Sequence, residues 1–274
     1  MINRILVALF FIPLLIWIYL KGDLTFLLFT NVIVGVGLYE FYRMMKQANK
    51  AVALEYGVIL GMVSSTLMYS AFKGNMKVSG YLIPIIVFFV GSLFTIRVAK
   101  KQIEGSTEYI GNTLLGILYI PLMFLHAYSI KALENGGAWL LTIQFLLWIS
   151  DSAAYFVGIK FGRKIIKKGL SEISPKKSYE GLLGSLIFTI LGIFIIKFVV
   201  FKNMNIGNLH MIVLALIVSL GGTVGDLAES MFKREFGVKD SGEALGEHGG
   251  ILDRFDSMIF VLPIVFYYFK YIIL

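Results

Sequence analysis

The chain of 274 residues contains no cysteine, and only 15% of its residues are charged. The absence of cysteine excludes disulfides and thiolate metal sites, so a bound metal would need oxygen or nitrogen ligands. With 58% hydrophobic residues, the chain has too few polar side chains to cover its apolar surface in water. These shortages exclude an ordinary soluble domain and indicate a protein of the lipid bilayer.

Common nucleotide-binding and protease motifs are also missing. The sequence has no GxxxxGK[ST] phosphate loop, no GxGxxG in a strand–helix context and no HExxH. A nucleotide-dependent or metal-dependent activity would therefore need a different arrangement of residues.

Apolar runs of roughly 16–22 residues recur along the chain, and helices of that length cross a hydrocarbon core about 30 Å thick. We predict an all-α polytopic membrane protein with about nine transmembrane helices in one domain, residues 1–274. Residues 1–135 would serve packing or dimer contacts, and residues 136–274 would supply catalytic helices and cytoplasmic loops. The predicted spans are 5–20, 24–39, 52–72, 78–96, 109–130, 138–159, 182–201, 209–228 and 255–272.

The N-terminal run has no small-x-small cleavage pattern before Lys21, so we expect a retained helix rather than a cleaved signal peptide. Eighteen lysines and arginines fall in the N-terminal segment and the loops after spans two, four, six and eight, whereas five fall in the other loops. Because cytoplasmic loops are enriched in these residues, we predict a cytoplasmic N-terminus and an outside C-terminus. The net charge of +8 then reflects basic loops at the membrane, and no nucleic-acid partner is expected.

Three aspartates stand where the chain leaves or re-enters the bilayer: Asp226 ends one apolar run, and Asp253 and Asp256 begin the next. Charge is costly at that depth and marks functional sites by default. Three gathered carboxylates would repel one another without a cation among them, and oxygen ligands favour Mg²⁺. The alternative is that Asp253 pairs with Arg254 or caps the last helix, while Asp226 pairs with Lys233.

Two further groups of residues suit phosphate. The segment Ser174-Pro175-Lys176-Lys177-Ser178 interleaves hydroxyl and ammonium groups. The second group shares a segment with the acids: Lys233, Arg234, Lys239, His248 and the conformationally free pair Gly249-Gly250. The alternatives are a basic face near anionic lipid and exposed ion pairs of little energy. Asp151 lies inside an apolar span, where a functional role and a structural hydrogen bond are equally open.

The acidic and basic residues together match a known signature. The segments Ser230-Met-Phe-Lys233-Arg234, Lys239-Asp240-Ser-Gly242 and Leu245-Gly246-Glu-His248-Gly249-Gly250-Ile251-Leu-Asp253-Arg254-Phe-Asp256 resemble the signature of phosphatidate cytidylyltransferases, or CDP-diacylglycerol synthases. The region Asp151-Ser-Ala-Ala-Tyr155 to Gly181 is also similar to that family. The resemblance covers about residues 145–270. One departure is Gly246-Glu247, where many members have Pro-Gly, and this leaves the shape of that turn open.

The resemblance implies that CTP and phosphatidic acid give CDP-diacylglycerol and pyrophosphate, with Mg²⁺ and, in part of the family, K⁺. It implies a homodimer in the inner membrane with its site facing the cytoplasm. The implied metal ligands are Asp226, Asp253 and Asp256, and the implied catalytic residues are Asp226, Lys233, Asp253 and Asp256. The implied substrate-binding residues are Ser174, Lys176, Lys177, Ser178, Arg234, Lys239, Asp240, His248, Gly249, Gly250 and Arg254, with Asp151 as a tentative member of the site.

Two other classes remain open at this stage. Another CTP-dependent lipid enzyme, such as a polyprenol kinase or a CDP-archaeol synthase, would share the metal and nucleotide features but use a different acceptor. A cation-coupled transporter would also place acids in the membrane, but near the middle and in related repeats. The charges of this chain instead gather toward one face, and no inverted repeat is visible.

Overall fold

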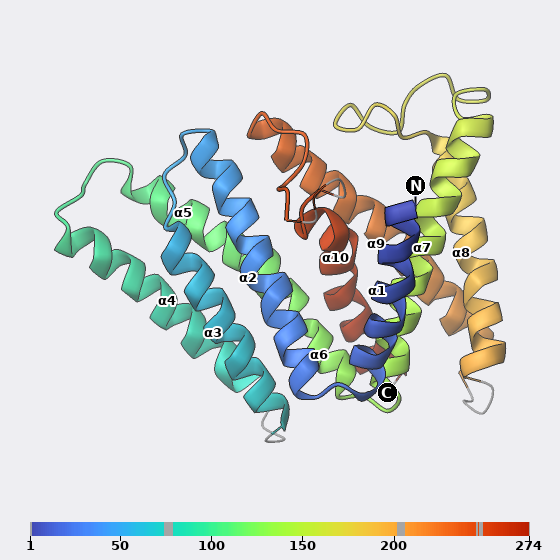
Figure 1. The fold of residues 1–274 in the computed structure, drawn as a ribbon, viewed down its shortest axis with the longest axis horizontal. Coiled ribbons are helices and arrows are strands. Elements are labelled where there is room, and N and C mark those ends of the chain that lie inside the picture. The colour runs from blue at the N-terminus through green and yellow to red at the C-terminus, as the bar shows by residue number, and fades with distance from the viewer. Residues whose placement is uncertain (1, 74–78, 202–205, 245, 247–248, 274) are drawn as a thin grey trace.

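The computed structural model describes the backbone of residues 2–73, 79–201, 206–244, 246 and 249–273, and this part of the chain is helical (Figure 1). The described residues contain no strand beyond a single bridge between Gly169 and Ser178. The elements are α1 (Ile2–Lys21), α2 (Leu24–Gln47), α3 (Leu54–Lys73), α4 (Ser79–Ala99), α5 (Ser106–Ile117), η1 (Leu118–Leu122), α6 (His126–Lys131), α7 (Gly136–Phe161), α8 (Tyr179–Val200), α9 (Asn208–Glu235), α10 (Leu252–Tyr268) and η3 (Phe269–Ile273).

Successive helices run in alternating directions, so the long loops 162–178 and 236–251 lie at the same end of the bundle (Figure 1). The start of α1 lies at this end and the end of α10 at the other. Segments α5, η1 and α6 form one bent run, because Pro121 has no N–H to donate and the backbone widens to a π-helix around it. Each predicted span overlaps one of these helices or runs.

Six helical runs in the described residues are long and apolar enough to cross a membrane, consistent with a polytopic membrane protein. The runs are Leu24–Gln47, Ser106–Lys131, Gly136–Phe161, Tyr179–Val200, Asn208–Glu235 and Leu252–Ile273. Helix α3 is not among them, and it carries four serine and threonine side chains, those of Ser64, Ser65, Thr66 and Ser70. The count of nine spans and the orientation of the termini therefore stay predictions.

Helix α10 is the centre of the packing. It contacts α9 and α7 on one side and α2 and α6 on the other, so both halves of the chain meet on it. Its buried face includes Phe255, Met258 and Ile259. Small residues let α9 approach: Gly222 accepts a 3.0 Å hydrogen bond from the Ser257 hydroxyl at its carbonyl oxygen.

Gly225 is the tightest of these approaches. A Cβ there would lie 2.8 Å from the Asp256 carbonyl oxygen and 2.9 Å from Ser257 Cα. We predict that Gly225→Ala separates α9 from α10 and destabilises the protein by about 1–3 kcal/mol, the usual cost of overpacking. Gly111→Ala on α5 is the matched control, because a Cβ there meets nothing within 4 Å. Thermal unfolding in detergent measures both, and equal unfolding temperatures would contradict the prediction.

Candidate active site

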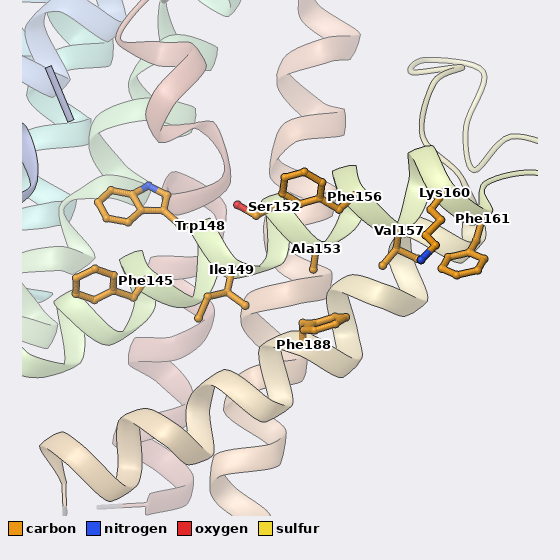
Figure 2. A pocket seen from close by; sticks show the side chains of 10 residues that line it. All are labelled: Phe145, Trp148, Ile149, Ser152, Ala153, Phe156, Val157, Lys160, Phe161 and Phe188. Atoms are coloured by element: carbon orange, nitrogen blue, oxygen red, sulfur yellow. The ribbon is translucent and has the colours of Figure 1, made fainter. Parts of the chain in front are cut away.

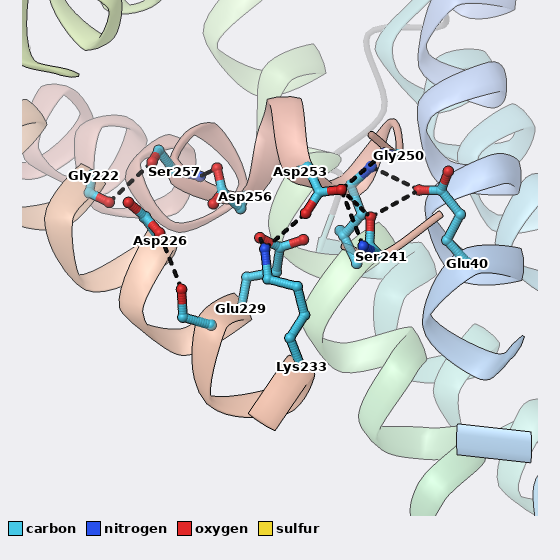
Figure 3. A network of polar contacts seen from close by, with 12 residues as sticks. Glu40, Gly222, Asp226, Glu229, Lys233, Ser241, Gly250, Asp253, Asp256 and Ser257 are labelled. Carbon is cyan, nitrogen blue, oxygen red and sulfur yellow. Dashed lines mark hydrogen bonds and ion pairs between the residues drawn. The ribbon is translucent and has the colours of Figure 1, made fainter. Parts of the chain in front are cut away.

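A buried ion cluster joins α9 to α10 (Figure 3). Lys233 Nζ lies 2.7 Å from Glu229 Oε2, one turn earlier on α9, and 2.7 Å from Asp253 Oδ1 in the first turn of α10. The three side chains are only 13%, 1% and 11% exposed, respectively. Charges held out of water are stable only when paired and hydrogen-bonded, so this cluster fixes the two helices against each other.

Asp253 also closes the loop that precedes α10. Its Oδ2 accepts hydrogen bonds from the backbone N–H of Gly250 at 2.8 Å, from the N–H of Ser241 at 3.0 Å and from the Ser241 hydroxyl at 2.9 Å. Gly249 has a φ of +79°, and a Cβ there would lie 2.8 Å from Asp253 Oδ2, so only glycine fits this turn. Asp253 therefore joins the segment before the last helix, whose N-cap residue is Ile251, to the first turn of that helix, and it pairs with Lys233.

A second carboxylate reaches the same loop from the N-terminal half. Glu40 on α2 is 3% exposed. Its Oε1 accepts from the N–H of Ile251 at 3.1 Å, and its Oε2 accepts from the N–H of Leu252 at 2.9 Å and from the Ser241 hydroxyl at 3.4 Å (Figure 3). The start of α10 is thus held by two acids, one from its own chain segment and one more than 200 residues away.

The remaining acids form a separate group. Asp226 and Asp256 face one another in Figure 3, and Asp256 interacts electrostatically with both Asp226 and Asp151. Asp256 is 8% exposed, and its Oδ1 accepts the N–H of Ser257 at 2.5 Å. Asp226 pairs with Lys177 rather than with Lys233: Lys177 Nζ lies 2.6 Å from Asp226 Oδ2. Asp256 therefore lies within electrostatic range of Asp226, Asp151 and Glu229, whereas Asp253 is engaged by Lys233.

The acid group fits a cation in part. The ammonium of Lys177 already occupies the position of a positive charge against Asp226. Glu229 Oε1 is buried with no hydrogen-bond donor among the described residues, and it lies within electrostatic range of Asp256. In the same part of the chain, however, no three acidic or histidine side chains gather closely enough to hold a metal ion. The fit extends to Asp226 and Asp256 but not to Asp253, whose two oxygens are both engaged.

Lys177 and Asp226 line a cavity of about 420 Å³ between α7, α8 and α9. Asp151, Lys176 and Ser178 line it as well, together with apolar atoms of Tyr155 and Ile159. The cavity thus combines carboxylate and ammonium groups with apolar side chains in one lining. Such a mixture suits a phosphate carried on a lipid.

The basic loop that supplies Lys177 is built by capping interactions. The Ser178 hydroxyl accepts from the N–H of Gly181 at 3.1 Å and begins α8. The buried carboxylate of Glu180 accepts from the N–H groups of Arg163, Ile165 and Ile166 at 2.8–3.1 Å. These contacts fold the loop back over the end of α7, which places Lys177 above Asp226.

A second, polar cavity of about 850 Å³ lies on the other side of the α10 start. The predicted residues Lys239, Asp240, Gly249 and Arg254 line it, and α2 adds Arg43 and Gln47. Asp253 of the buried ion cluster also lines this cavity. Three other predicted residues line neither cavity. Arg234 is exposed, and Ser174 is half-buried in the loop 162–178. Gly250 packs against Glu40. His248 lies outside the described residues.

An apolar groove of about 490 Å³ runs along α7 and α8 (Figure 2). Phe145, Trp148, Phe156 and Phe188 line it, and Lys160 lies at one end. Its α7 residues lie on the opposite side of that helix from Asp151, so the groove is separate from the acid group.

Three acids of this region are absent from the sequence prediction: Glu40, Glu180 and Glu229. Glu229 had a detectable signal, since it lies four residues before Lys233 and such pairs meet on a helix. Glu180 lies two residues after the capping serine, in the first turn of α8. Glu40 had only its position inside an apolar run, which marks an expensive charge but names no partner.

Comparison with known proteins agrees with the signature. The sequence profile of the cytidylyltransferase family matches residues 2–272. The phosphatidate cytidylyltransferase of Bacillus subtilis (strain 168) is 32% identical over 269 residues, which cover 97% of this chain and 96% of that protein. The protein of the same name from Staphylococcus haemolyticus is 32% identical over 264 residues, covering 96% and 95%. The chain therefore belongs to the cytidylyltransferase family.

Proposed function

We propose that the protein is a phosphatidate cytidylyltransferase, which converts CTP and phosphatidic acid to CDP-diacylglycerol and pyrophosphate. The observation that carries this is the cavity lined by the paired Lys177 and Asp226, by Asp151 and by apolar residues such as Ile159 and Leu182. Relatives that bear this name match the chain over nearly its whole length. A cavity lined by both charged and apolar side chains suits a substrate with a phosphate on acyl chains.

The reaction needs no strong base. An oxygen of the lipid phosphate, already ionised at neutral pH, attacks the α-phosphorus of CTP. The new P–O bond forms as the bond from the α-phosphorus to the bridging oxygen breaks, and pyrophosphate leaves with that electron pair. The obstacle is repulsion between two anions, so catalysis rests on positioning and on neutralising charge.

We assign phosphate contacts to Lys177 and Lys176 on the lipid side of the site, and to Lys239 and Arg254 at the larger polar cavity on the CTP side. Asp226 and Asp256 would hold Mg²⁺, which typically takes one or two carboxylates and fills its remaining positions with water and substrate phosphate. When bound, the ion would neutralise phosphate charge during transfer. K⁺ as a second cation belongs to the same proposal, with Asp151 close enough to contribute.

The proposed setting follows from the basic loops. The loop 162–178 carries Lys164, Lys167, Lys168, Lys176 and Lys177, which favours the cytoplasmic side of the inner membrane, where CTP is available. We also propose a homodimer.

The transferred group can be identified by labelling. Purified protein in detergent, supplied with phosphatidic acid, Mg²⁺ and CTP labelled at the α-phosphate, should yield labelled lipid. CTP labelled at the γ-phosphate should release the label as pyrophosphate and leave the lipid unlabelled. Lipid labelled only from γ-CTP would instead identify a kinase, and no product from either label would refute the enzyme assignment.

The acid group can be tested by isosteric changes. Asp226→Asn and Asp256→Asn should each lower kcat on the order of 10²–10³-fold, the scale for loss of one preorganised electrostatic contact. Asp23→Asn, at an exposed aspartate paired with Lys73, is the control and should keep wild-type rates. Near-normal turnover by a folded Asp256→Asn protein would remove that residue from the proposed metal site.

Lys177 can be compared with a lysine of the same loop. Lys177→Gln removes the cation beside Asp226, so the KM for phosphatidic acid should rise on the order of tenfold, equivalent to about 1.4 kcal/mol of lost binding. Lys168→Gln removes the same charge from an exposed position outside the cavity and should change this KM less than twofold. If the two variants raised this KM equally, Lys177 would only add to the positive charge of the loop, and the proposed direct contact with the lipid phosphate would be wrong.

A further inference from the structure

Glu40 is the one acid of the described site region that comes from the N-terminal half, and neither the signature nor the proposed chemistry assigns it a role. Its carboxylate accepts the N–H groups of Ile251 and Leu252 at the start of α10. We propose that Glu40 is a positioning residue: by capping α10 from α2, it sets where that helix begins and therefore where Asp253 and Asp256 lie. This inference rests on the proposed function.

The first argument is backbone chemistry. The first N–H groups of a helix have no partner inside the helix and must be satisfied from outside. Glu40 accepts the N–H of Leu252, the first residue of α10, and that of Ile251, its N-cap residue, while Asp253 accepts the N–H of Gly250 just before them. The positive end of the helix dipole also stabilises a carboxylate at this place. The buried carboxylate of Glu40 on α2 is therefore stabilised by the N–H groups of Ile251 and Leu252 and by the Ser241 hydroxyl.

The second argument is fit. A Cβ on Gly242 would lie 2.5 Å from Glu40 Oε1, and a Cβ on Gly250 would lie 2.6 Å from Oε2. The loop thus leaves room for the carboxylate by having glycine on both sides of it. The Ser241 hydroxyl, which donates toward both Glu40 and Asp253, joins the two acids into one network.

The third argument is that α2 is itself fixed. Phe41, the next residue on α2, packs edge-on against Phe232 with ring centroids 5.1 Å apart, and against Phe236 at 6.1 Å. Phe232 lies in the last turn of α9, and Phe236 is the residue that follows this helix. Helix α2 therefore contacts α9 through Phe41 and α10 through Glu40, and it sets the relative position of the two helices that supply Asp226 and Asp256.

The test uses the full-length protein and three variants. Glu40→Gln keeps the shape but replaces the charged acceptor pair with one acceptor and one donor, so it opposes an N–H group with an NH₂ group. Glu40→Asp keeps the charge with a shorter reach. Glu55→Gln is the matched control, because that glutamate is 78% exposed and pairs with Lys46 on the surface.

We expect Glu40→Gln to lower kcat about 10–100-fold, the range for losing a residue that orients metal ligands, with the KM for CTP changed less than threefold. Glu40→Asp should recover part of the loss, and Glu55→Gln should behave as wild type. A purely structural role would instead reduce the amount of folded protein while leaving the kcat of the folded fraction unchanged, and that result would overturn the proposal.

Hydrogen exchange of the wild-type protein provides a readout that does not depend on activity or on a variant that folds. The peptide covering residues 249–255 should be protected like the interior of α10, and Glu40→Gln should expose it while peptides from α7 and α8 stay unchanged. Rapid exchange of this peptide in the wild type would refute the capping role. Because exchange needs no substrate, a wild-type protein that makes no labelled lipid would refute the proposed function and leave the capping result to stand or fall separately.

Discussion

The ion pair between Lys233 and Asp253 is the contact on which the rest of the site depends. It joins α9 to α10 at a place with little access to water, where removing one partner would leave an unpaired charge at a cost of about 3–5 kcal/mol. Glu229 also pairs with the Lys233 ammonium, and the N–H groups of Ser241 and Gly250 donate to the Asp253 carboxylate. The cluster therefore fixes both helices and the segment between them.

This arrangement divides the acids into two groups with different tasks. Asp253 and Glu40 are satisfied by hydrogen bonds, so they build the start of α10. Asp226 pairs with Lys177, and Asp256 lies within electrostatic range of Asp226 and Asp151; these are the acids to which we assign the proposed cation. The two groups can lie close together because Asp253 and Asp256, three residues apart on α10, contact different neighbours: Asp253 contacts Lys233, and Asp256 lies near Asp226.

The N-terminal half contributes more than packing. Glu40 reaches the start of α10, and Arg43, one turn further along α2, lines the larger polar cavity. Helix α10 lies between the two halves, so a contact from α2 acts on the same helix that carries Asp256. The prediction that residues 1–135 serve packing or dimer contacts stays a prediction, and the structure adds that Glu40 and Arg43 of this part lie beside the proposed site.

The sequence by itself determined the helical class and the approximate place of each helix, because apolar length is a local property. It did not determine the helix ends: α2 continues to Gln47 and α9 to Glu235, past the predicted span ends at 39 and 228. The segments proposed to carry the chemistry stay predictions. The sequence also indicated that Asp226, Asp253 and Asp256 meet near one membrane depth. Only the tertiary structure decided their partners: Asp226 with Lys177, Asp253 with Lys233, and Glu40 with the start of α10. Spacing along a helix gives the face of a residue but not which distant element supplies its counter-charge. That choice depends on how the loop 162–178 folds back and on how α2 packs against α9, and neither has a signal in the local sequence.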